Sequence, residues 1–97
     1  MIRLEYSQKA LADINRLVLF LMENDISVAL DTFGIIDEAI QVLKRHPDIG
    51  RITSTTGKRE LVISRGRTGY IAIYEFDKLT DVVVILAIKH QRENEFN

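Results

Sequence analysis

Seven apolar residues run without interruption from 82 to 88 (VVVILAI), and five polar residues follow at once (KHQRE, 89–93). The run is far shorter than the roughly 18 residues that would span a bilayer, and its β-branched composition is typical of a buried strand. A strand with one wet face should alternate, but this one is apolar on both sides, with residues 82, 84, 86 and 88 facing one way and 83, 85 and 87 the other. The chain must therefore bury both faces of a strand whose end carries basic, titratable side chains.

The N-terminal third predicts a strand followed by a helix. Residues 2–6 alternate between apolar and charged, which indicates a short half-buried strand. Ser7 is a suitable N-cap for the helix that follows and that Asn24 and Asp25 end. Its apolar stripe recurs at intervals of three and four residues: Ala10, Leu11, Ile14, Leu17, Val18 and Leu21.

A second helix is predicted over residues 27–45, stopped by Pro47. Gly34 lies inside this helix and should cost about 1 kcal/mol relative to alanine. We expect a close approach of the first helix at Gly34 to compensate for that cost. The predicted stripe of this helix consists of Ala29, Phe33, Ile36, Ile40 and Leu43.

Three strands are predicted after a loop over residues 49–58: residues 60–64, 70–76 and 82–89. The links between them are short enough for antiparallel hairpins. The fold class is therefore α+β: a short N-terminal strand, a helical hairpin and a three-stranded antiparallel meander, with the helices on one face of the sheet. Two helices do not easily cover both faces, so either the sheet curls on itself or, as we prefer, another polypeptide covers the second face.

The chain has 97 residues and no cysteine, which indicates one domain over residues 1–97 and excludes disulfides, thiolate metal sites and a cysteine nucleophile. The N-terminus lacks the apolar segment of a signal peptide. From these features we expect a soluble, cytoplasmic protein without a membrane partner. The two histidines, His46 and His90, are far apart in the sequence with no evident third ligand, so neither a metal nor a cofactor is expected.

Charge is unevenly distributed along the chain. Residues 1–43 contain three basic and seven acidic side chains, a net of −4, whereas residues 44–97 contain ten basic and seven acidic, a net of +3. The basic excess suits an anionic partner, although lysine and arginine also gather in any solvated loop. The predicted basic interaction edge consists of Arg59, Arg65, Arg67, Lys89, His90 and Arg92.

Antiparallel pairing would bring the turn after residue 64 to the same end of the sheet as residues 89–92. Such an edge could bind phosphates through arginine forks. It could instead cleave RNA without a metal, with His90 as acid or base and Glu60 or Glu93 as the second titrating group. The simpler interpretation of His90 is a hydrogen-bonded surface residue, so no catalytic residue is assigned with certainty.

Four motifs occur in a characteristic order: H-P-x-I-G-R (46–51), R-E-L-V-I (59–63), Y-I-x-x-Y (70–74) and I-L-x-I-x-H-x-R-E (85–93). Together they resemble the RelE/ParE superfamily of toxins from bacterial type II toxin–antitoxin systems, and the likeness covers nearly the whole chain. The spacing of Ser7, Ala10, Asp13 and Ile14 is similar to that of the ParE, or plasmid-stabilisation, branch.

The resemblance implies the fold predicted above and a cognate antitoxin whose C-terminal segment wraps the toxin and covers the sheet. The ParE branch is associated with inhibition of DNA gyrase by binding, and the RelE branch with ribosome-dependent cleavage of messenger RNA. The endonuclease branch carries an arginine where Tyr70 and Ile71 stand here, and it has a terminal tyrosine or histidine, whereas no tyrosine follows Lys89 and His90.

The resemblance therefore favours a growth-inhibiting ParE-like toxin that binds gyrase and is not an enzyme. The alternative is a ribosome-dependent mRNA endonuclease using Arg59, Arg67, Lys89, His90 and Arg92. A third possibility is a degenerate homologue that binds its antitoxin without being toxic. A homodimer or a hetero-oligomer with the antitoxin is compatible with each of these.

Overall fold

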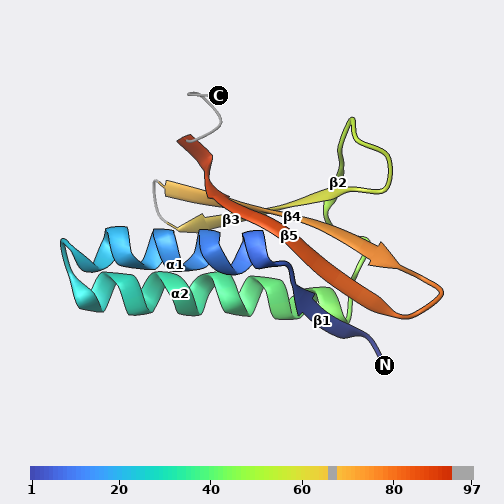
Figure 1. The fold of residues 1–97 in the computed structure, drawn as a ribbon, viewed down its shortest axis with the longest axis horizontal. Coiled ribbons are helices and arrows are strands. Elements are labelled where there is room, and N and C mark those ends of the chain that lie inside the picture. The colour runs from blue at the N-terminus through green and yellow to red at the C-terminus, as the bar shows by residue number, and fades with distance from the viewer. Residues whose placement is uncertain (66–67, 93–97) are drawn as a thin grey trace.

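The computed structural model describes residues 1–65 and 68–92, and it places two antiparallel helices against one face of a five-stranded sheet (Figure 1). The predicted fold class is confirmed. The helices are α1 (Gln8–Met22) and α2 (Ile26–Gln41), and a 3₁₀ turn, η1 (Val42–Lys44), continues the second. The strands are β1 (Arg3–Tyr6), β2 (Arg51–Ile52), β3 (Arg59–Arg65), β4 (Thr68–Asp77) and β5 (Val82–His90).

The sheet order is β1-β5-β4-β3-β2. The meander β3-β4-β5 is antiparallel as predicted, and β1 adds to it in parallel with β5, pairing Arg3 with Val82 and Tyr6 with Ile85. The strand β2 was not predicted, because it has only two residues and its side chains are exposed. No helix within the described residues is long and apolar enough to cross a bilayer.

Caps set the helix boundaries. The side chain of Ser7 accepts a hydrogen bond from the backbone N of Ala10, so Ser7 is the N-cap of α1, as predicted. Asp25 caps α2 in the same way by accepting from the backbone N of Ser27 and Val28. The second helix therefore begins one residue earlier than predicted.

The core between the helices and the sheet is apolar, and its largest fully buried side chains include Tyr74, Ile40 and Leu43. Two residues of the predicted stripes are exposed: Leu11 is 54% exposed and Phe33 is 45% exposed. Both lie at the margin of their helical stripe: Leu11 is about 100° around the helix from the buried Ala10, and Phe33 about 60° from the buried Ile36. The hydrophobic pattern alone does not show which apolar side chains at the margin of a stripe remain exposed to solvent.

The predicted alternation of β5 is wrong beyond Ile85. A register shift between Ile73 and Tyr74 opposes Ala87 to Ile73 and Ile85 to Tyr74, so Leu86 is an extra residue on the β5 side. Because of this bulge, Ile85 and Ile88 both enter the core with Val83. A strict period of two assigns Ile88 to the wrong face.

The explanation given for Gly34 is also wrong. A Cβ built on Gly34 would meet nothing within 4 Å, leaving aside the backbone of its own helix. The first helix therefore does not approach this position closely, and nothing in the described structure explains why glycine stands there.

Candidate functional site

The end of β5 carries Lys89 and His90, with Arg92 just beyond it. The register pairs Tyr70 with His90 and Ile71 with Lys89, and it pairs Arg65 with Thr68 on the neighbouring strands. The ends of β3 and β5 therefore lie at the same end of the sheet, on either side of the start of β4. Arg67 lies outside the described residues, and of Arg65 only the backbone is described.

His90 makes two contacts of known geometry. Its ring packs edge-on against Tyr70, with centroids 5.3 Å apart at an interplanar angle of 86°. Its Nδ1 accepts a hydrogen bond of 3.0 Å from the backbone N of Arg92. In the neutral ring the proton therefore resides on Nε2. Both contacts fix the imidazole at the point where β5 ends.

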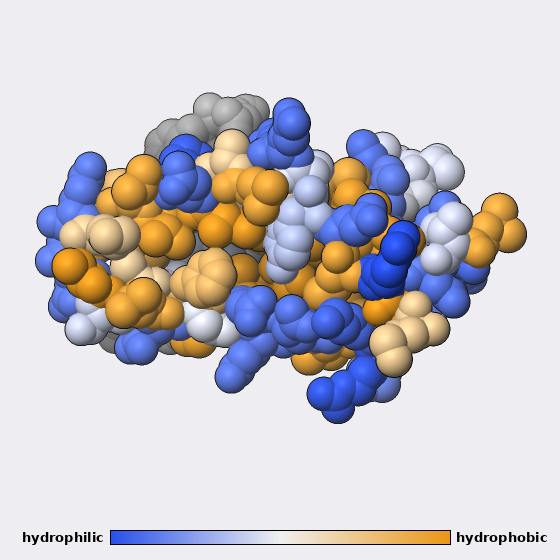
Figure 2. All heavy atoms as spheres, turned by 60° about the horizontal axis from the view of Figure 1, so that its bottom comes forward, coloured by the Kyte–Doolittle hydropathy of each residue, from blue (hydrophilic) through white to orange (hydrophobic). Residues whose placement is uncertain are grey.

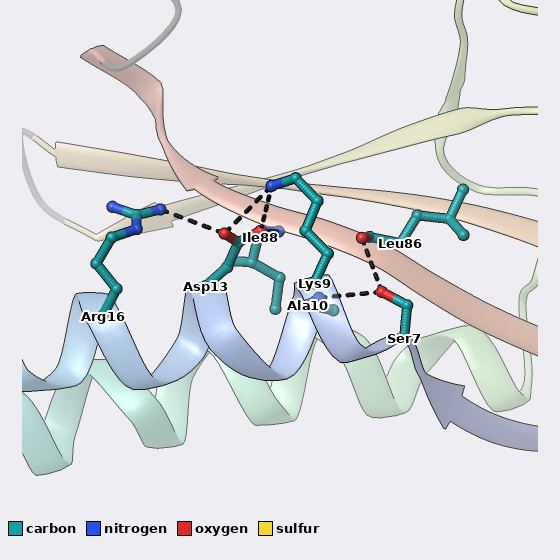
Figure 3. A network of polar contacts seen from close by, with 7 residues as sticks. All are labelled: Ser7, Lys9, Ala10, Asp13, Arg16, Leu86 and Ile88. Atoms are coloured by element: carbon teal, nitrogen blue, oxygen red, sulfur yellow. Dashed lines mark hydrogen bonds and ion pairs between the residues drawn. The ribbon is translucent and has the colours of Figure 1, made fainter.

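A buried carboxylate connects α1 to β5 immediately before this cluster (Figure 3). Asp13 Oδ2 accepts a hydrogen bond of 3.0 Å from the backbone N of Ile88, and the residue is only 7% exposed. Lys9 Nζ lies 3.1 Å and Arg16 Nη2 3.6 Å from its two carboxylate oxygens. Asp13 therefore supplies the acceptor that β1, which ends at Tyr6, no longer supplies to the edge of β5.

Ser7 makes a complementary contact two residues earlier on β5, as a donor. Its hydroxyl donates a hydrogen bond of 2.9 Å to the carbonyl of Leu86 while accepting from the N of Ala10 (Figure 3). Neither of these two contacts with β5 was predicted from the sequence. The spacing does indicate a buried position for Asp13, because it lies three residues after Ala10 and four before Leu17, within the buried stripe of α1.

Arg59 lies apart from the β5 cluster, at the opposite end of β3 from Arg65. Its guanidinium donates hydrogen bonds to the carbonyls of Asp48 (3.1 Å) and Gly50 (2.9 Å), and it lies 3.6 Å from the Asp48 carboxylate. Of the six residues in the predicted basic edge, the structure thus places Lys89, His90 and Arg92 together and Arg59 elsewhere. Arg59 holds the loop that follows η1.

Tyr74 holds the same loop from within the core. Its hydroxyl donates to the carbonyl of Pro47 at 2.7 Å and accepts from the backbone N of Gly50 at 2.9 Å. Burial is the main cause that raises the pKa of Tyr74, opposed by the Gly50 hydrogen bond and the charge of Arg59. Arg59 and Tyr74 together give three of the sequence motifs a physical role: H-P-x-I-G-R supplies the loop, and R-E-L-V-I and Y-I-x-x-Y supply the residues that anchor it.

The face of the sheet away from the helices has an apolar centre. Val62, Ile71, Ile73 and Ala87 alternate with the core residues of their strands and pair with one another across β3, β4 and β5. Val62 is 42% exposed, and no described element covers this face (Figure 1). Lys89 borders it beside Ile71. Among the described residues, no group of three His, Asp or Glu side chains could hold a metal ion.

Comparisons with known proteins agree with this architecture. The family model described as "ParE toxin of type II toxin-antitoxin system, parDE" matches residues 4–95. A comparison with curated protein sequences found no match.

Three solved structures illustrate the similarity of fold. A chain of the chromosomal ParDE toxin–antitoxin system of P. aeruginosa superposes with a TM-score of 0.77 at 22% identity, covering 93% of this chain and 96% of that one. A chain of the intact E. coli RelBE complex superposes with a TM-score of 0.64 at 13% identity, covering 91% of this chain and 94% of that one. A chain of the M. tuberculosis RelBE2 complex superposes with a TM-score of 0.61 at 22% identity, covering 93% of this chain and 98% of that one. At these identities the likeness shows the fold.

Proposed function

This chain belongs to the ParE toxin family of type II toxin–antitoxin systems, and from this membership we propose that it is the toxin of such a module. In this proposal it inhibits DNA gyrase by binding, in the cytoplasm, and a cognate antitoxin neutralises it. The solved complexes of similar fold are toxin–antitoxin systems, which supports an antitoxin partner.

The uncovered sheet face supports the proposed antitoxin contact. Its apolar centre at Val62, Ile71, Ile73 and Ala87 is continuous across three strands, and the helices occupy only the opposite face (Figure 1). An apolar segment of a partner would remove Val62 and the half-buried Ile73 from water, which is favourable by about 25 cal/mol per Å² of apolar area. The antitoxin segment implied by the family would pack here.

The residues at the start of β4 favour inhibition by binding over catalysis. Tyr70 and Ile71 stand where the resemblance places an arginine in the endonuclease branch. Of the two, Ile71 is 5% exposed and pairs directly with Lys89. An aliphatic side chain at this position stabilises no developing charge on a phosphate. Arg59, named in the alternative catalytic set, is engaged with Asp48 and Gly50 at the other end of β3.

The test is to express the protein alone in a bacterial host and to assay gyrase supercoiling and cellular RNA ends from the same cultures. We expect growth arrest, loss of supercoiling or trapped DNA breaks, and intact messages. Co-expression with the cognate antitoxin should restore growth. No growth defect from the protein alone would contradict the proposal and would leave an antitoxin-binding homologue without toxicity.

Ribosome-dependent mRNA cleavage is the second candidate, because Lys89, His90 and Arg92 gather next to Tyr70 at one end of the sheet. In that case new message ends should appear at codon positions while supercoiling stays normal. His90→Ala should then abolish toxicity but leave antitoxin binding intact. Under the gyrase proposal the same variant leaves messages as intact as the wild type does.

A further inference from the structure

A cavity of about 250 Å³ lies between the loop that joins β2 to β3 and the end of β4. This is the end of the sheet opposite to the one where β5 ends (Figure 1). The lining combines three basic side chains and one carboxylate with two apolar side chains: Lys58, Arg59, Lys78, Asp48, Ile52 and Phe76. Pockets for drug-sized ligands measure roughly 300–1,000 Å³, so this cavity suits a smaller molecule.

Two of the charged groups in this lining neutralise each other. Arg59 Nη2 lies 3.6 Å from the Asp48 carboxylate, and its Nη1 donates to the backbone carbonyls of Asp48 and Gly50. Lys58 and Lys78, by contrast, form no ion pair with any side chain of residues 1–65 and 68–92. The cavity therefore has a net charge of +2, from two ammonium groups that are available to an anion.

Hydrogen bonds within the loop fix the backbone of the first lysine. The carbonyl of Lys58 accepts a hydrogen bond of 3.1 Å from the backbone N of Thr53, and its own N donates one of 3.1 Å to the carbonyl of Thr55. Gly57 precedes it with a φ of +81°, a left-handed conformation that glycine adopts without strain. Lys58 therefore starts from a well-defined position beside the cavity.

The end of β4 supplies an aromatic ring and the second lysine. Phe76 is half-buried, pairs with Val83 of β5 and packs against the core. Lys78 follows two residues later, and because side chains alternate along a strand, both side chains line the cavity. The carboxylate of Asp77, between them, accepts a hydrogen bond of 2.9 Å from the backbone N of Leu79. It is not part of the lining.

We propose that this cavity binds a small phosphate monoester that carries an aromatic ring, the chemistry of a nucleoside monophosphate. A phosphate monoester has a charge of about −1.5 to −2 at pH 7, which matches the net charge of the cavity, whereas a single carboxylate would offset only half of it. Lysine binds phosphate as a point charge, so Lys58 and Lys78 hold the phosphate. The aromatic ring of the ligand lies against Phe76, where stacking is favourable.

The helices do not compete for this anion. Residues 7–41 contain six acidic and two basic side chains, a net of −4. Figure 2 shows apolar atoms gathered over the half of the helical hairpin near its turn. A dianion is repelled there and attracted to the basic end of the sheet. The inference goes beyond the proposed function, since the cavity would bind its ligand without gyrase or an antitoxin.

The test is isothermal titration calorimetry of the full chain with adenosine 5′-monophosphate, adenosine and ribose 5-phosphate. We expect the nucleotide to bind at least about tenfold more tightly than either fragment, because adenosine lacks the charge and ribose 5-phosphate lacks the ring. A rise in salt from about 50 mM to about 500 mM should weaken binding of the nucleotide, since salt screens exposed charges.

Variants of the lining locate the binding site. Lys58→Gln and Lys78→Gln should each weaken binding of the nucleotide by about tenfold, because each removes one charge from the phosphate. Phe76→Leu keeps an apolar side chain but removes the ring, so it should weaken binding of the nucleotide and leave that of ribose 5-phosphate unchanged. The matched control is Lys9→Gln on α1, beside Asp13, which should leave binding unaltered. Thermal unfolding of each variant checks that it is folded.

Four outcomes would overturn the inference. The first two are no binding of the nucleotide at millimolar concentration and equal binding of the nucleotide and ribose 5-phosphate. The third is weaker binding in Lys89→Gln but not in Lys58→Gln or Lys78→Gln, which would place the anion at the end of β5. The fourth is tighter binding of a 5′-phosphorylated trinucleotide, which would assign the site to the end of a nucleic-acid chain. None of these measurements involves gyrase or growth, so failure here and failure of the proposed function are separate results.

Discussion

Asp13 joins α1 to the end of β5 through its side chain. Its carboxylate is nearly buried, and the hydrogen bond to the N of Ile88 is the contact that water cannot easily replace. The two ion-pair partners, Lys9 and Arg16, have side chains 70% and 50% exposed, so solvent screens them and they contribute little. Asp13 therefore stabilises the fold mainly by accepting the hydrogen bond from the backbone N of Ile88.

Asp13→Ala should lower the free energy of unfolding by about 1–3 kcal/mol, because it leaves the Ile88 N–H buried without an acceptor. Asp13→Asn keeps an acceptor oxygen and should cost less than Asp13→Ala. Arg16→Ala, which removes only an exposed ion pair, should change stability by less than about 0.5 kcal/mol. Urea unfolding of the three variants gives these values. A cost for Asp13→Asn equal to that of Asp13→Ala would show that the charge, and not the acceptor, stabilises the site.

The buried phenol of Tyr74 predicts a loss of stability in alkali. Burial raises the pKa of Tyr74 in the folded state above the usual 10.0 of an unfolded tyrosine, and burial with the nearby charge of Asp37 does the same for Tyr6. The neutral forms are therefore favoured by folding, so their contribution is fully present below pH 10 and is lost as pH rises through the folded pKa values. Urea unfolding from pH 8 to 11 should show the decline. In Tyr6→Phe/Tyr74→Phe the slope above pH 10 should be shallower, and an unchanged slope would exclude this cause.

At the scale of the element, two glycines give opposite predictions. A Cβ on Gly50 would lie 2.6 Å from the hydroxyl and ring of Tyr74 and 2.9 Å from the carbonyl of Glu60, so Gly50→Ala must displace the anchored loop. A Cβ on Gly34 meets nothing within 4 Å. Gly50→Ala should therefore destabilise by about 1–3 kcal/mol, and Gly34→Ala should stabilise by up to about 1 kcal/mol. Thermal unfolding of both variants tests this, and a destabilising Gly34→Ala would mean that the glycine has a role that packing does not show.

The helices and strands also show how much of the fold could be predicted from the sequence. Periodicity, caps and turn residues were enough for both helices and for the antiparallel meander, because these depend on local chemistry. The parallel pairing of β1 with β5 was not predictable, since it joins residues about 80 positions apart. The bulge at Leu86 was not predictable either, because it depends on how β5 pairs with β4 and not on the period of the strand itself. The site divides in the same way: antiparallel pairing predicts that residues 89–92 lie beside the turn before β4. Only the register shows that Arg59 lies at the far end of β3 and serves the loop at 47–50.

At the scale of the whole molecule, a single layer of helices covers one face of the five-stranded sheet, and no element within residues 1–65 and 68–92 covers the other. The strands are apolar on both sides at their centre, which is normal only where both faces are covered. A free chain must therefore expose Val62 and part of Ile73 and Val84 to water. A partner that binds this face would stabilise the fold by mass action.

In the absence of a partner, the protein should self-associate through this sheet face. Sedimentation equilibrium across micromolar concentrations should show a rising average mass, because each copy offers the same exposed apolar surface around Val62. Val62→Lys places a charge in that surface and should shift the equilibrium towards the monomer. Leu79→Lys, at the β4–β5 turn, adds the same charge and should not. Unfolding measured alongside separates a change in association from a change in stability. A wild-type protein that stays monomeric at these concentrations would show that the half-buried side chains of the sheet shield one another well enough without a partner.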